Sequence, residues 1–110
     1  NVTVENSTEG IDLAAGTWTL GFYWMDYGEE EMLQGWTLVL NEDTTGLLRS
    51  ADGKEMQIVW YYDEAHDEEL YLYESYVDGH RCGGRLDLTF GIAEPRFEII
   101  DGAKGAAFFQ

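Results

Sequence analysis

The chain has 110 residues, of which 22 are Asp or Glu and only six are Lys or Arg, so its formal net charge at neutral pH is −16. This length suits one domain with its own core. Hydrophobic residues make up 45% of the chain, which is typical of a folded protein despite the charge. The carboxylates disfavour direct contact with nucleic-acid phosphates and anionic membranes. The single Cys cannot form an intramolecular disulfide, and no apolar run approaches the ~20 residues of a membrane-spanning helix.

Residues 1–12 are mostly polar or acidic and show no stable hydrophobic period. Position 1 is Asn rather than Met, which favours a chain trimmed from a longer precursor. We therefore expect a polar linker over residues 1–12 and one folded domain over residues 13–110.

Short runs of alternating apolar and polar residues begin at Gly16, and turn residues separate them about every ten positions, as in antiparallel β proteins. In such runs one parity faces the core and the other faces solvent. The residues expected to face the core are Trp18, Leu20, Phe22, Trp24, Trp36, Leu38, Leu40, Met56, Ile58, Trp60, Tyr62, Leu70, Leu72 and Tyr76.

The runs predict an all-β fold of eight strands joined by short turns such as Asp78-Gly79 and Asp101-Gly102. No connection is long enough for a parallel crossover, so we expect an antiparallel up-and-down meander. Eight such strands close most simply into a small barrel, which leaves no exposed edge. A bulge or bend is expected at Gly83-Gly84. Between the first two strands, the segment from Asp26 to Gln34 is expected to be a loop or a helical turn that forms a lid.

Three sequence elements resemble those of the bacterial lipocalin-like domains, which are small extracytoplasmic barrels of the calycin type. They are Gly16-Thr17-Trp18-Thr19-Leu20, then Leu38-Val39-Leu40 with the acidic turn Asn41 to Gly46, and finally Ala107-Phe108-Phe109. The resemblance implies a lipocalin-like barrel with Trp18 buried at one end, in a lipoprotein of the cell envelope or in a secreted protein. It implies fold and compartment more than activity, because such barrels carry unrelated functions.

The core aromatics leave two interpretations of the barrel interior. They could line a cavity for a small apolar or planar ligand, or they could fill the narrow interior and leave room only at its mouth. A ligand site is expected near the lid, where Met side chains can adapt to a ligand. The expected ligand-binding residues are Trp24, Tyr27, Met32, Leu33, Trp36 and Trp60.

His80 and Cys82 are two residues apart in an expected strand and would face the same side, as two metal ligands might. Zinc would need further ligands, from His66 or a carboxylate, and a turn histidine beside an ordinary buried thiol is the simpler interpretation. Five carboxylates within residues 63–69 could attract a cation, but the segment lacks the spacing of a calcium loop. We predict no metal site and no cofactor. We also predict no catalytic residues, because no nucleophile and base stand at a suggestive spacing.

Two functions remain. The first is a non-catalytic extracytoplasmic binding domain that holds a small apolar molecule at the barrel mouth. The second is an acidic interaction or inhibitory module that engages a basic protein surface without a small ligand. Neither function involves insertion of this domain into a membrane. Contiguous aromatics on the outer face would favour the second, and the residues expected there are Thr17, Thr19, Val59, Tyr61, Tyr71 and Tyr73.

Overall fold

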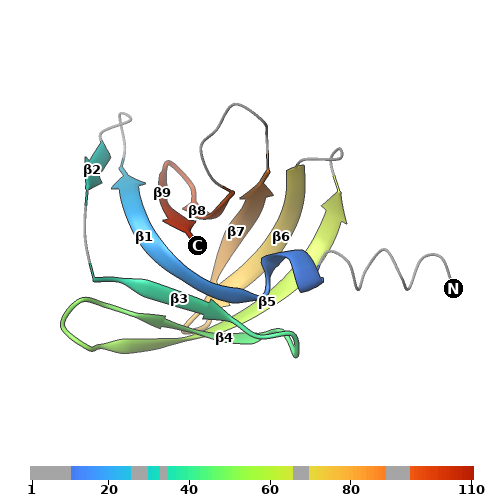
Figure 1. Ribbon diagram of the computed structural model, residues 1–110, viewed down its shortest axis with the longest axis horizontal. Helices are drawn as coiled ribbons and strands as arrows, with labels where there is room; N and C mark the ends of the chain where they lie inside the picture. The colour runs from blue at the N-terminus through green and yellow to red at the C-terminus, as the bar shows by residue number, and fades with distance from the viewer. Residues whose placement is uncertain (1–10, 26–29, 33–34, 66–69, 89–94) are drawn as a thin grey trace, which may run out of the picture.

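The structure is a computed structural model that describes residues 11–25, 30–32, 35–65, 70–88 and 95–110 (Figure 1). Within these ranges the chain is almost entirely β, with one helical turn at residues 11–14. None of the helical structure in these ranges is long and apolar enough to cross a membrane. The strands are β1 (Gly16–Trp24), β2 (Glu30–Met32), β3 (Thr37–Leu40), β4 (Thr45–Arg49), β5 (Glu55–Ala65), β6 (Leu70–Val77), β7 (His80–Asp87), β8 (Arg96–Asp101) and β9 (Lys104–Phe109).

Eight antiparallel strands form a closed up-and-down barrel, which confirms the predicted fold class. Each strand from β3 to β9 pairs with the next, and β9 returns to pair with β1 and closes the barrel. The short strand β2 pairs with residues 22–24 of β1, beyond the part of β1 that pairs with β3. The predicted lid segment therefore contains a strand, while its residues 26–29 and 33–34 lie outside the described residues.

Turn residues fix the hairpins. Asp78 and Gly79 form the two-residue turn between β6 and β7 with φ values of 50° and 84°, as a type I′ hairpin requires. Between β3 and β4, the Asp43 carboxylate accepts hydrogen bonds from the Thr45 hydroxyl at 2.6 Å and from the Thr45 backbone N–H at 3.0 Å. The hydroxyl bond and then the backbone bond lower the pKa of Asp43. The ionised carboxylate therefore stabilises this turn.

The helical turn at residues 11–14 lies beside the start of β1 (Figure 1). The indole N–H of Trp18 donates to the carbonyl oxygen of Ala14 at 2.9 Å, and both residues are buried. The Trp18 ring lies 5.9 Å from the Phe97 ring, centroid to centroid, and Ile11 packs against the same core. Trp18 thus holds the helical turn against the barrel.

Aromatic rings fill much of the interior. The centroid of Tyr73 lies 5.6 Å from that of Trp60 and 5.4 Å from that of Phe97. Burial raises the pKa of Tyr73 well above its usual value. A Cβ at Gly84 would lie 3.2 Å from Tyr73 and 3.3 Å from Phe97, so glycine leaves room for both rings. The predicted bulge at Gly83-Gly84 is wrong, because β7 pairs with β6 and β8 without a register shift.

The predicted faces of β6 are reversed. Tyr73 is 4% exposed rather than on the outer face. Both parities of β6 carry apolar residues, so alternation alone does not assign its faces. The register assigns them, because Ser75 lies opposite the buried Trp60 and Tyr73 lies opposite Tyr62. The same reversal places Tyr71 on the core side and Leu70, Leu72 and Tyr76 on the outer side.

Strand β1 changes faces at a bulge. Its register with β9 shifts between Leu20 and Phe22, so one extra residue is present on β1. Each side chain after such an insertion changes face. Leu20 stays in the core, and after the shift Tyr23, opposite Ala106, joins the same side.

The same bulge moves two predicted core residues to the outside, so the predicted inward placement of Phe22 and Trp24 is wrong. Their rings lie 6.3 Å apart, and Phe22 lies 6.1 Å from Phe109. A Cβ at Gly21 would lie 2.4 Å from the Phe109 ring, and one at Gly105 would lie 2.1 Å from the Trp24 ring. Glycine at both positions therefore leaves room for these rings against the barrel wall.

Substitution of adjacent residues on β5 tests the assigned faces. Trp60→Ala should lower the free energy of unfolding by about 3–5 kcal/mol, because it removes a buried ring and leaves a cavity. Tyr61→Ala should cost only about 0.5 kcal/mol, as surface changes do, because Tyr61 is 49% exposed. Urea denaturation followed by circular dichroism measures both values. Equal losses would contradict the fold.

The lowered pKa of Asp43 predicts a pH-dependent contribution to stability. The folded-state pKa lies below the ordinary value of 3.8, so the contribution is present above 3.8 and is lost as the pH falls through the folded-state pKa. Asp43→Asn should lower Tm at neutral pH and match the parent protein in acid. Thermal melts over a pH series measure the difference, with Glu42→Gln as a control on the adjacent exposed carboxylate. A Tm difference that does not change with pH would contradict this role.

Candidate binding site

An apolar cavity of about 340 Å³ opens within the barrel. This volume lies near the lower end of the ~300–1,000 Å³ that is typical of small-molecule sites. Side chains of β1, β4, β8 and β9 line it, together with the residue before β3. The lining residues are Leu20, Tyr23, Trp36, Leu48, Ile99, Ala106 and Phe108.

The unfilled space has a local cause. The bulge of β1 brings Tyr23 to the inner face opposite Ala106, whose methyl group leaves volume free. Elsewhere the interior is closed by Trp18, Trp60 and Phe97, each at most 1% exposed. The interior therefore combines a filled core with a cavity.

A second cavity of about 510 Å³ adjoins the first, because both are lined by Tyr23, Leu48, Ile99 and Ala106. It lies at the barrel mouth, where the β6–β7 and β8–β9 hairpins turn. Its other lining residues are Trp24, Met25, Val77, His80, Cys82, Asp101, Lys104 and Gly105. The apolar cavity thus opens past polar side chains.

The predicted ligand-binding residues lie at different places relative to the two cavities. Trp36 lines the inner cavity and Trp24 borders the outer one. Trp60 lines neither, because it is fully buried and its indole N–H donates to the Thr45 carbonyl oxygen at 3.1 Å. Met32 lies in β2, with its side chain undescribed, and Tyr27 and Leu33 lie outside the described residues.

Sequence reasoning did not identify most of the lining. Leu20 was expected in the core, and its apolar parity could have marked it as a lining residue. No sequence signal marks Tyr23 or Ala106 as neighbours, because their pairing depends on the bulge and on barrel closure.

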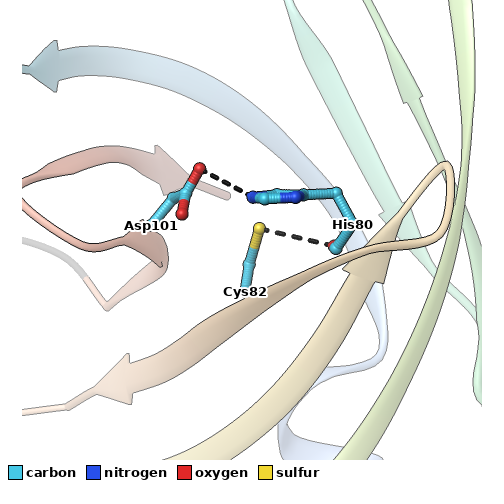
Figure 2. Close-up of side chains that lie close together, drawn as sticks. All are labelled: His80, Cys82 and Asp101. Carbon is cyan, nitrogen blue, oxygen red and sulfur yellow. Dashed lines mark hydrogen bonds and ion pairs between the residues drawn. The ribbon is translucent and has the colours of Figure 1, made fainter.

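Three polar side chains converge at the mouth (Figure 2). His80 Nε2 lies 3.0 Å from Asp101 Oδ2, and the Cys82 thiol donates to the His80 carbonyl oxygen at 3.7 Å. Burial raises the pKa of the Cys82 thiol, and the Asp101 carboxylate raises it further. The thiol is therefore protonated at neutral pH.

Negative charge dominates the surface, because four of the six cationic side chains form ion pairs with carboxylates. This field favours neutral or cationic ligands over anions. The acidic segment predicted at residues 63–69 begins with the exposed Asp63 and Glu64 at the end of β5, and its residues 66–69 lie outside the described residues. The ion pairs are Arg49–Glu55, Arg81–Glu74, Arg85–Glu98, Arg96–Glu98 and Arg96–Asp87.

The outer face of the barrel carries a small aromatic patch on β5 and β6. Val59 is 38% and Tyr61 49% exposed, and the Tyr61 and Tyr76 rings meet edge to face with centroids 6.5 Å apart. Exposed aromatic residues are enriched at protein-binding surfaces.

Comparison with known proteins gives no significant match to any protein-family model, curated protein or solved structure. Functional inference therefore depends on the cavity, its mouth and the outer surface.

Proposed function

We propose that this domain is a non-catalytic binding protein that holds a small, apolar, neutral or cationic molecule in the barrel. The apolar cavity of about 340 Å³ is the observation that carries the proposal. Burial of apolar ligand surface against this lining supplies the binding free energy. The lining is hydrocarbon and aromatic, which suits binding and offers no acid–base pair for catalysis.

The outer cavity gives the ligand its entry path. Met25 and Val77 continue the apolar lining toward solvent, whereas His80, Asp101 and Lys104 surround the opening with polar groups. A ligand with an apolar body and a polar end fits this order of side chains. The net charge of −16 disfavours an anionic group at that polar end.

The proposed compartment is extracytoplasmic, and the proposed family is the lipocalin-like barrels. Support comes from the Gly16-Thr17-Trp18 element at the first strand of a closed eight-stranded barrel. The buried Trp18, bound to the preceding helical turn, also agrees with this proposal.

Titration with N-phenyl-1-naphthylamine, a neutral apolar dye, tests the proposed function. Its fluorescence should rise saturably with one dye per protein. Ala106→Leu should weaken binding at least about tenfold, the effect of a misfit methylene in a hydrophobic pocket. Ala103→Leu, in the exposed β8–β9 turn, should leave binding unchanged. Circular dichroism of both variants shows that the fold is retained.

Dye binding that is equally strong in Ala106→Leu would contradict this site. Absence of binding by the parent protein would favour the second candidate, an acidic module for a basic protein surface. The patch of Val59, Tyr61 and Tyr76 supports that candidate. It predicts amide shift changes on the outer faces of β5 and β6 when an oligolysine peptide is added, and their loss in Tyr61→Ser.

A further inference from the structure

We propose that His80, Cys82 and Asp101 bind a zinc ion at the barrel mouth, with a fourth coordination position open to the outer cavity. The proposal is independent of apolar ligand binding. In the proposed function these three side chains only line the outer cavity.

The three residues supply one nitrogen, one sulfur and one oxygen atom. Their candidate ligand atoms all lie within 4.8 Å of one another, and His80 Nε2 and Asp101 Oδ2 are 3.0 Å apart. Neighbouring ligands in a tetrahedral zinc site lie about 3.3–3.6 Å apart at the usual bond lengths. Small side-chain rotations therefore bring the three atoms to coordination distance.

Backbone pairing holds the three ligands together. His80 and Cys82 are two residues apart on β7, so their side chains lie on the same face of the strand. The β7–β8 ladder ends at Gly83↔Ile100, and the next positions in the same register are Cys82 and Asp101. The carboxylate is thus placed opposite the thiol by the sheet rather than by a loop. Figure 2 shows the side chains pointing toward one another from the two hairpins.

The donor set selects the metal. A thiolate disfavours calcium and magnesium, which prefer oxygen ligands, whereas the combination of thiolate, imidazole and carboxylate suits zinc. All three residues line the outer cavity. Structural zinc sites have four protein ligands. Zinc sites with three protein ligands instead keep a position open for water or an external ligand. Water or the polar end of a bound molecule would take the fourth position.

The exposure of each ligand is compatible with metal entry. His80 and Asp101 have exposed side chains, at 65% and 51%, so zinc can reach them from solvent. Cys82 is 7% exposed and lies at the inner side of the site. Because its thiol must lose a proton to bind the metal, zinc has to displace that proton.

Cobalt(II) is the probe for this site, because it takes zinc geometry and gives a thiolate-to-metal charge-transfer absorption band. Cys82 is the single Cys of the chain, so any such band reports this residue. Titration of the reduced full chain with cobalt should give the band with saturation at one metal per protein. Added zinc should remove the band by displacement. Carboxylates elsewhere can bind cobalt but cannot produce this absorption.

Variants then test the other two ligands. Cys82→Ser should abolish the band. His80→Gln and Asp101→Asn should each weaken cobalt affinity by at least about tenfold, since even outer-shell partners of metal sites cost about 10–100-fold. A control substitution at an exposed carboxylate of the β3–β4 turn, Glu42→Gln, should leave affinity unchanged. The His80 and Asp101 side chains are exposed. The circular dichroism of the His80→Gln and Asp101→Asn variants should therefore match that of the parent protein.

Either of two cobalt results would overturn the proposal. One is the absence of a thiolate band at a cobalt excess in the folded, reduced protein. The other is a band whose affinity is the same in the parent, His80→Gln and Asp101→Asn. Zinc affinity measured by competition with a chromophoric chelator gives a second readout. Full zinc affinity in Cys82→Ser would assign binding to surface carboxylates and would also overturn the site.

Discussion

The pairing of β1 with β9 is the constraint on which the rest of the structure depends. Without it, the meander would be an open sheet with two free edges. Closure requires β1 to follow the curve of the barrel, and the bulge between Leu20 and Phe22 lets it do so while its far end also pairs with β2. One inserted residue thus decides which aromatic side chains face inward.

This constraint also divides the interior. Trp18, Trp60 and Phe97 form a densely filled region, and beyond it the bulge pairs Tyr23 with the small Ala106. The free volume is a consequence of that pairing, since a continuous alternation would have placed Trp24 inside. The polar residues at the mouth come from hairpins whose turns are fixed by local chemistry. The apolar lining and the polar side chains of the mouth therefore depend on different parts of the chain.

Much of the fold could be predicted from alternation and turn residues. The barrel, the burial of Trp18 and the inward face of β5 follow directly from the sequence. The faces of β6 could not be predicted, because Tyr73 and Tyr76 both suit a core and only register separates them. The only sequence feature at the bulge is Gly21. Glycine in a strand does not by itself predict a bulge, because it also occurs at bends and close approaches.

The candidate site was less predictable than the fold. Trp36 was found by parity, whereas Tyr23 needed the bulge and Asp101 needed the β7–β8 register. Nuclear Overhauser effects around β1 test the central claim most directly. We expect contacts of the Tyr23 ring with the Ala106 methyl and of the Trp24 indole with the Gly105 α-protons on the outer face. Contacts of the Trp24 indole with Ile99 and Phe108, without those of Tyr23, would show an unbulged strand and contradict it.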